Sequence, residues 1–204
     1  MIGNDEILGI ILAGGLSKRM GNINKSLALI NNKTLLEITY GLVKKQLKNV
    51  VVNSNLNLKK KIKSNLEIIP DSIPGFLGPL SGILSGMQFA KKEYPKCKWL
   101  VSFPVDSIFF PSDFVEKMIN RINNETQIVC ATSNGRAHPV FAFWSLNLID
   151  DLENALVEEG VRKIDEWTKR YNLEFTNFQN KDLDPFFNIN TKEDLKFATE
   201  YLNS

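Results

Sequence analysis

A glycine-rich, basic segment directly follows a short apolar run near the start of the chain. Residues 12–25 read Leu-Ala-Gly-Gly-Leu-Ser-Lys-Arg-Met-Gly-Asn-Ile-Asn-Lys. The adjacent Gly14 and Gly15 let the backbone bend sharply and approach a ligand closely, and successive free N–H groups in such a loop hold phosphate oxygens. Three cations lie nearby: Lys18, Arg19 and Lys25. This combination suits the several negative charges of a triphosphate.

Two familiar phosphate-binding motifs are absent from this segment. A P-loop needs glycine followed by lysine and then serine or threonine, but Gly21 is followed by Asn22, and Lys25 follows Asn24. The dinucleotide motif GxGxxG also fails, because its first two glycines are separated by one residue. P-loop NTPases and NAD-type dehydrogenases are therefore disfavoured. Two glycines alone would be read as a turn with solvated cations, whereas the whole string favours nucleotide binding.

The elements that must position this segment alternate in type along the chain. Short apolar runs predict strands at 7–13, 50–53, 66–69, 99–104, 128–132 and 140–144, with an edge strand at 173–178. Amphipathic spacing predicts helices at 34–48, 58–64, 80–90, 113–123 with Ser112 as N-cap, one or two within 148–171, and 192–202. Thr191 and Asp194 form a predicted capping box for the last helix.

This alternation predicts a three-layer, Rossmann-like α/β domain with a mostly parallel central sheet, formed by residues 1–204 as a single domain. Ligands in such sheets bind at the carboxyl ends of the strands. Three polar features follow predicted strands: the Gly14–Gly15 loop, Asn53 and Asp106. Their convergence at one edge of the sheet follows from the topology.

Composition restricts the classes of partner and compartment. The 204 residues carry a formal net charge of +2, which argues against nucleic acid or a membrane surface as a partner. The two cysteines, Cys97 and Cys130, lie in no metal-binding pattern, and Cys130 is expected in the core. No secretory segment or membrane-length apolar run is present in the sequence, so we expect a cytoplasmic protein.

The segment at 12–25 resembles the signature of the glycosyltransferase-A-like nucleotidyltransferases, and within them the chain is most similar to the molybdenum cofactor guanylyltransferase (MobA) family. Further landmarks of that family follow in its order over nearly the whole chain: Asn53 within 52–55, Asp71 ahead of Gly-Pro-Leu at 78–80, Pro104-Val105-Asp106, His138-Pro139 and Phe-Asn-Ile-Asn-Thr at 187–191. Two positions depart from the family pattern. Asn24 stands where the family often has aspartate before the loop lysine, and Val105 stands where a small or polar residue often precedes the metal-binding aspartate.

The resemblance implies an activity, a cofactor and a set of site residues. The activity is transfer of GMP from GTP to molybdenum-molybdopterin, forming the guanine dinucleotide cofactor and pyrophosphate, with Mg²⁺ held by Asp106. Lys25, Arg19 and Asp106 are the implied catalytic residues. The implied GTP site comprises Leu12, Ala13, Gly14, Gly15, Lys25, Asn53, Asp71 and Asp106. Family members are also expected to contact cofactor-synthesis proteins and the apoenzymes that receive the cofactor.

The acceptor is expected at the C-terminal part of the chain and the nucleotide at the N-terminal part. His138, Asn188 and Asn190 are the candidate acceptor-binding residues, the two asparagines alternating on a strand-like segment so that both side chains point the same way. Asn190 or Asn188 would also contribute to the metal shell. His138 is the only histidine, and a lone histidine is more often structural than catalytic. The pterin ring would stack on phenylalanines, of which at least two are expected in the core: Phe109, Phe110, Phe186 and Phe187.

Several alternatives stay open at this level. Asp71 contacts either the base or the ribose of the nucleotide, or is simply a turn residue beside Pro70. Asp106 has the alternative of capping the turn that follows its strand. A sister nucleotidyltransferase would use CTP, or a sugar or polyol phosphate as acceptor. A non-catalytic GTP-binding cofactor chaperone would bind the nucleotide without releasing pyrophosphate.

Overall fold

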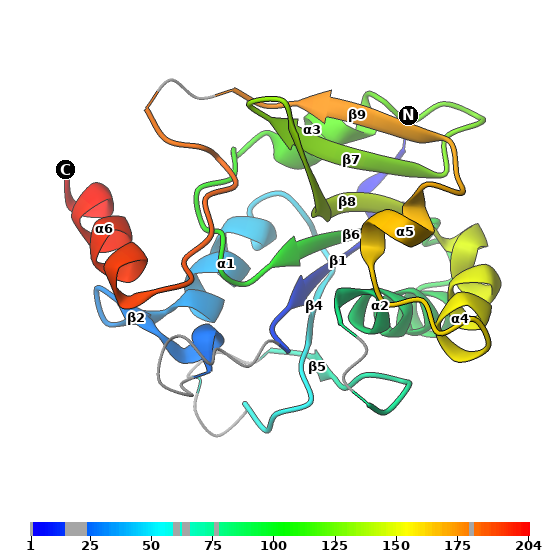
Figure 1. Ribbon diagram of the computed structural model, residues 1–204, viewed down its shortest axis with the longest axis horizontal. Helices are drawn as coiled ribbons and strands as arrows, with labels where there is room; N and C mark the ends of the chain where they lie inside the picture. The colour runs from blue at the N-terminus through cyan, green and yellow to red at the C-terminus, as the bar shows by residue number, and fades with distance from the viewer. Residues whose placement is uncertain (1, 15–23, 59–61, 63–65, 76–77, 180–181) are drawn as a thin grey trace.

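A seven-stranded sheet organises the chain, with helices on both of its faces (Figure 1). The computed structural model describes residues 2–14, 24–58, 62, 66–75, 78–179 and 182–204. The strand order is β5-β4-β1-β6-β8-β7-β9. Neighbouring strands are parallel from β5 to β6 and between β7 and β9, whereas β8 runs antiparallel to both of its neighbours. The predicted α/β fold with a mostly parallel sheet is confirmed.

The strands of the sheet are short and largely buried. They are β1 (Ile7–Leu12), β4 (Val50–Asn53), β5 (Ile68–Ile69), β6 (Trp99–Pro104), β7 (Ile128–Ser133), β8 (Arg136–Ser145) and β9 (Leu173–Asn177). A separate antiparallel ribbon pairs β2 (Leu29–Ile30) with β3 (Lys33–Thr34). The α-helices are α1 (Leu35–Lys44), α2 (Pro79–Glu93), α3 (Phe114–Ile119), α4 (Ile149–Val157), α5 (Ile164–Thr168) and α6 (Lys192–Asn203). The 3₁₀ turns are η1 (Asn4–Glu6), η3 (Lys25–Leu27) and η4 (Leu146–Leu148).

Strand β1 is buried on both faces, which is why its sequence is continuously apolar. Ile7 and Ile11 pack into a core with residues of α1 and α3, whereas Leu8 and Ile10 pack into a second core with residues of α2, α4 and α5. The alternation of side chains along a strand therefore divides one apolar run between two layers. Together with the sheet these two helical layers make the three-layer arrangement. Among the described residues, no helix combines the length and apolarity that a membrane crossing requires.

Most predicted elements are present, with corrections at their ends. Helix α1 stops at Lys44 and not at 48, α3 covers only Phe114–Ile119, and β5 only Ile68–Ile69. Ser112 is not the N-cap of α3: Asp113 takes that position, and its carboxylate pairs with Lys117 at 2.8 Å. Strand β8 begins at Arg136, four residues earlier than the predicted 140, beside a register shift in β7.

Two further predictions concern segments near the ends of these elements. The capping box of Thr191 and Asp194 is confirmed at the start of α6. The segment before it is irregular and is not a strand, which corrects the strand-like reading of Asn188 and Asn190. The helix predicted at 58–64 lies largely outside the described residues. Within that range the structure describes only Leu58 and Ile62, which are buried and are not assigned to a helix.

Helix α2 approaches the sheet closely because it carries glycine at the contact. A Cβ atom added at Gly82 would lie 2.4 Å from Asn53 Oδ1 and 2.8 Å from Leu12 Cδ2, which is too close for either pair of atoms. Gly41 of α1, by contrast, has nothing within 4 Å of its added Cβ. Gly82 therefore determines how near α2 lies to the carboxyl ends of β1 and β4.

We expect Gly82→Ala to lower the free energy of unfolding by about 1–3 kcal/mol, because overpacking must displace Asn53 or Leu12. Gly41→Ala, at an exposed position inside a helix, should raise it by about 0.5–1 kcal/mol. Urea unfolding of the two variants beside the wild type measures both changes. A Gly82→Ala protein as stable as Gly41→Ala would contradict the close contact.

Candidate active site

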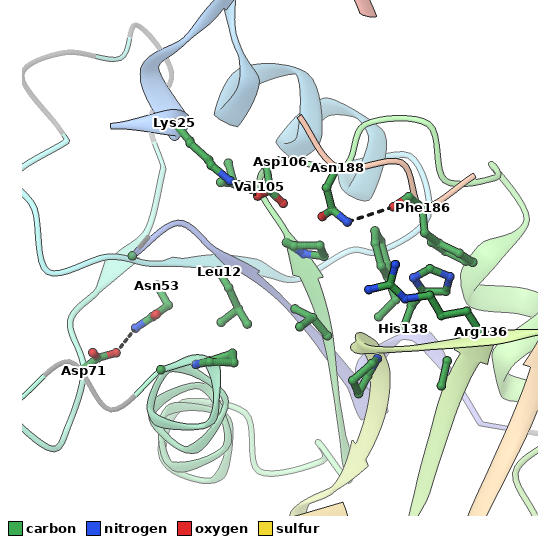
Figure 2. Close-up of a pocket in the computed structure, with 18 residues that line it drawn as sticks. Leu12, Lys25, Asn53, Asp71, Val105, Asp106, Arg136, His138, Phe186 and Asn188 are labelled. Atoms are coloured by element: carbon green, nitrogen blue, oxygen red, sulfur yellow. Dashed lines mark hydrogen bonds and ion pairs between the residues drawn. The ribbon is translucent and has the colours of Figure 1, made fainter. Parts of the chain in front are cut away.

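A cavity of about 600 Å³ opens at the carboxyl ends of β1, β4 and β6 (Figure 2). It extends from the start of α2 to the first residues of β8. Eight of the residues predicted from the sequence line it: Leu12, Gly14, Lys25, Asn53, Asp71, Asp106, His138 and Asn188. Residues distant in the chain thus meet in one hollow, as the parallel topology predicts.

Four other predicted residues stand differently. Gly15 and Arg19, like Lys18, lie outside the described residues. Ala13 is buried, and its backbone N–H donates to the carbonyl of Asn53 at 2.9 Å, so that this N–H is not free for a nucleotide base. Asn190 is absent from the cavity lining but contacts Lys25.

The ammonium group of Lys25 lies between two oxygen atoms. Its Nζ is 2.9 Å from Asp106 Oδ2 and also donates a short hydrogen bond to Asn190 Oδ1. The side chains of Lys25 and Asp106 are only 17% and 19% exposed, so that their attraction is screened less than at an open surface. Convergence of a carboxylate and an amide oxygen on one positive charge shows that this point of the cavity favours a cation.

Local structure places both partners of this ion pair. Asn24 caps the 3₁₀ turn η3 by accepting from the Ser26 N–H at 3.0 Å, and Lys25 is the first residue of that turn. The unusual Asn24 thereby supplies a side-chain oxygen to the turn without adding a negative charge. Asp106 follows β6, and its carbonyl accepts the Ile189 N–H at 2.8 Å. That bond brings the irregular segment with Asn188 and Asn190 to the site.

A second polar group lies at the other side of the cavity, centred on Asp71. Asn53 Nδ2 donates to one carboxylate oxygen at 2.9 Å, and Asn55 Nδ2 donates to the other at 2.8 Å. The Asp71 N–H in turn donates to Asn55 Oδ1 at 2.8 Å. Asn55 was not among the predicted site residues, although its alternation with Asn53 just beyond β4 was a signal for it. These bonds hold the carboxylate of Asp71 in one orientation.

His138 lies at a third part of the cavity, on the first half of β8. Its Nε2 is 2.7 Å from the buried Ser133 Oγ, which donates to Asp184 Oδ1 at 2.8 Å. The ring packs 4.6 Å from the ring of Phe186. Burial lowers the pKa of His138, nearby Asp184 opposes this and Arg136 adds to it. The imidazole is therefore held uncharged at neutral pH, and neither Ser133 nor Asp184 was predicted from the sequence.

The four phenylalanines considered for the acceptor cleft separate into two groups. Phe110 and Phe186 are buried, which confirms that at least two belong to the core, and Phe186 also lines the cavity. Phe109 and Phe187 pack against each other at 6.3 Å and do not line it. Of these four, only Phe186 lines the cavity, and Phe141 of β8, which the sequence did not single out, lines it as well.

The donor set limits how this site would hold a metal ion. The described residues contain no group of three or more His, Cys, Asp or Glu side chains that would bind a metal. Asp106 supplies one carboxylate, and Asn190 supplies one amide oxygen that contacts the same Lys25 Nζ. Mg²⁺ commonly takes one or two carboxylates and completes its shell with phosphate oxygens and water. The residues present fit a Mg²⁺ ion that arrives with a phosphate ligand.

Comparison with known proteins gives consistent results. The profile of the MobA-like NTP transferase domain matches residues 9–172. The "Molybdenum cofactor guanylyltransferase" of Rhodopseudomonas palustris (strain HaA2) is 37% identical over 190 residues, covering 93% of this chain and 89% of that protein. The protein of the same name from Nitrobacter hamburgensis is 36% identical, covering 93% and 91%. The crystal structure of "Molybdopterin-guanine dinucleotide biosynthesis protein A" from Archaeoglobus fulgidus shares the fold, with a TM-score of 0.76 at 22% identity over 96% of this chain and 98% of that one.

The lowered pKa of His138 leads to a prediction on stability against pH. The unfolded chain takes up a proton at this residue near the ordinary value of 6.5, whereas the folded chain does so only at lower pH. The contribution of the uncharged His138 to the free energy of unfolding is therefore fully present above pH 6.5. It is lost as the pH falls from there toward the pKa of the folded protein. When the pH is lowered from 7.5 to 5.5, the free energy of unfolding measured in urea should fall more for the wild type than for His138→Gln. Equal losses would contradict the lowered pKa.

Proposed function

The chain belongs to the family of MobA-like NTP transferase domains, and from this membership and the geometry of the cavity we propose that it is a molybdenum cofactor guanylyltransferase. It transfers GMP from GTP to molybdenum-molybdopterin and releases pyrophosphate. The observation that carries the proposal is that the Lys25–Asp106 pair and the Asn53–Asp71 pair open onto the same cavity. Relatives that bear this function in their names match over most of the chain.

The guanine base is assigned to the side of the cavity that holds Asp71. Guanine presents an N1–H and an exocyclic amine, and both are donors that a carboxylate accepts. Each carboxylate oxygen has two lone pairs, so that Asp71 retains acceptor capacity beside its bonds to Asn53 and Asn55. Adenine lacks this pair of donors and would leave the carboxylate unsatisfied, which is a strong basis for discrimination.

The triphosphate is assigned to the glycine loop and the cations beside it. Gly14 lines the cavity next to Leu12, and Gly15 and Arg19 follow in the sequence. Lys25 neutralises phosphate oxygens, and Asp106 is the protein ligand of Mg²⁺. When bound, Mg²⁺ supplies neutralisation of the charge that develops on the leaving pyrophosphate. Lys25 and Arg19 stabilise the transition state at the α-phosphorus by the same electrostatic means.

The acceptor is assigned to the part of the cavity formed by the C-terminal half of the chain, with His138, Asn188 and the ring of Phe186. Its phosphate oxygen attacks the α-phosphorus of GTP while the bond from that phosphorus to the β-phosphate oxygen breaks. The attacking phosphate is already ionised, so that no general base is required. Asn190 contacts Lys25 and thus lies where the two substrates would meet. The protein's contribution is positioning and charge.

We expect calorimetric titration with Mg²⁺ to show tighter binding of GTP than of ATP, CTP or UTP. Asp71→Asn should weaken GTP binding about 10–100-fold, because a hydrogen bond to a charged acceptor contributes more than one to a neutral acceptor. It should also reduce the preference for GTP over ITP, which lacks the exocyclic amine. The exposed Asp150→Asn in α4 serves as the matched control and should bind as the wild type does. A preference for CTP would move the chain to the cytidylyl sister group.

Removing the carboxylate of Asp106 should affect turnover more than nucleotide binding. We expect Asp106→Asn to lower kcat by about 10²–10³, the loss typical of one electrostatic group in the transition state. Pyrophosphate release from GTP in the presence of molybdenum-molybdopterin measures this rate. Chelation of Mg²⁺ should abolish release by the wild type. Turnover that survives both changes would refute a metal ligand at this position, and GTP binding without any release would indicate a non-catalytic chaperone.

A further inference from the structure

A chain of three hydrogen-bonded side chains ends at the part of the cavity assigned to the acceptor. It runs from Asp184 through Ser133 to His138. We propose that Asp184 and Ser133 are positioning residues: they hold the single histidine with its proton on Nε2 and so leave Nδ1 as an acceptor for an N–H group of the acceptor's pterin ring. The identity of that ligand rests on the proposed function, whereas the position of the proton does not.

The direction of the bonds follows from the number of protons available. Asp184 Oδ1 accepts from Ser133 Oγ at 2.8 Å and from the Phe186 N–H at 2.9 Å, and a carboxylate has no proton to donate. The one hydroxyl proton of Ser133 is therefore used toward Asp184. Toward His138 the same oxygen can only accept, so that Nε2, 2.7 Å away, must carry hydrogen.

The surroundings of Ser133 and His138 stabilise this direction of the hydrogen bonds. Ser133 has no exposed surface, so that solvent offers no alternative partner for its hydroxyl group. Partial burial of His138 lowers the pKa of its imidazole and outweighs the opposing negative charge of Asp184, and the positive charge of Arg136 adds to the lowering. A neutral imidazole has one N–H, and with that N–H on Nε2 the lone pair belongs to Nδ1. Within the described part of the chain no side chain or backbone group bonds to Nδ1.

The neighbours of His138 indicate which kind of ligand edge the bare nitrogen suits. Arg136 precedes it by two residues on β8, and both residues line the cavity (Figure 2). A guanidinium group only donates hydrogen bonds, and the bare Nδ1 only accepts them. An edge that carries a carbonyl oxygen beside an N–H, as the pyrimidinone half of a pterin does, offers one partner to each. Phe186, packed on the imidazole ring at 4.6 Å, limits rotation of that ring.

The ring proton can be located directly, because the chain has only one histidine. A long-range ¹H–¹⁵N spectrum of histidine-labelled protein without substrates should show hydrogen on Nε2 and a bare Nδ1. Ser133→Ala should lose this preference and give a mixture of the two forms, whereas Ser133→Thr, which retains the hydroxyl group, should keep it. A wild-type ring protonated on Nδ1, or on both nitrogens at neutral pH, would overturn the relay.

Steady-state kinetics test the contact with the acceptor. Ser133→Ala should raise the KM for molybdenum-molybdopterin about five- to tenfold, the range of one neutral hydrogen bond, with kcat and the Kd for GTP unchanged. Ser133→Thr should restore the KM. Ser145→Ala, which removes a buried serine at the far end of β8, the strand that carries His138, is the matched control. An unchanged KM for the acceptor would refute the contact between His138 and the acceptor. An equal weakening of GTP binding would refute it as well.

The two measurements fail separately. A wild-type protein that binds GTP but transfers nothing would refute the proposed function, and with it the assignment of the pterin ligand. The spectrum of the free protein would still decide whether Asp184 and Ser133 set the ring proton. Thermal unfolding of each variant shows whether the substitution has changed the fold. The mixture of ring forms in Ser133→Ala counts as evidence only if that variant is folded, because an unfolded chain also leaves the ring proton unconstrained.

Discussion

Strand β1 pairs in parallel with β4 on one side and with β6 on the other, and all three end at the same level. Leu12 is the partner of Asn53 in one pairing and of Pro104 in the other. The residues at these strand ends therefore lie together: Gly14 beyond β1 in the middle, Asn53 at the end of β4 on one side and Asp106 beyond β6 on the other. Asp71, which follows the next strand, β5, joins Asn53. A shift of one residue in either register would turn the polar side chain at the strand end to the opposite face of the sheet.

Two backbone contacts extend this edge into a complete cavity. The carbonyl of Asp106 accepts the Ile189 N–H, which brings a segment more than eighty residues distant beside Lys25. On the other side β8 runs antiparallel to β6, so that its first residues, Arg136 and His138, lie near the carboxyl end of β6. The single reversed strand of the sheet thus brings the residues proposed to bind the acceptor next to those proposed to bind the nucleotide.

The sequence predicted the positions of residues that lie at strand ends, because the topology of the sheet determines them. It did not predict which side chains bond to one another. Continuous apolar runs located β1, β4 and β6, and strand ends then placed Asn53 and Asp106. Asn188 and Asn190 came from resemblance alone, and their strand-like reading was wrong. The hydrogen bond from Ser133 to Asp184 joins residues 51 positions apart, and no local pattern in the sequence predicts it. The sequence also did not indicate that the backbone N–H of Ala13 is bonded to the neighbouring strand.

Under the proposed function, the Lys25–Asp106 ion pair would favour binding of the nucleotide together with the metal ion. Two partly shielded charges at 2.9 Å satisfy each other, and removing one partner alone would leave the other with a desolvation cost and no compensation. A triphosphate alone would compete for Lys25 and leave Asp106 beside negative phosphate oxygens. A cation alone would compete for Asp106 and leave Lys25 facing positive charge. A triphosphate that arrives with Mg²⁺ offers each residue a partner of opposite charge, so that the pair separates without leaving an unpaired charge.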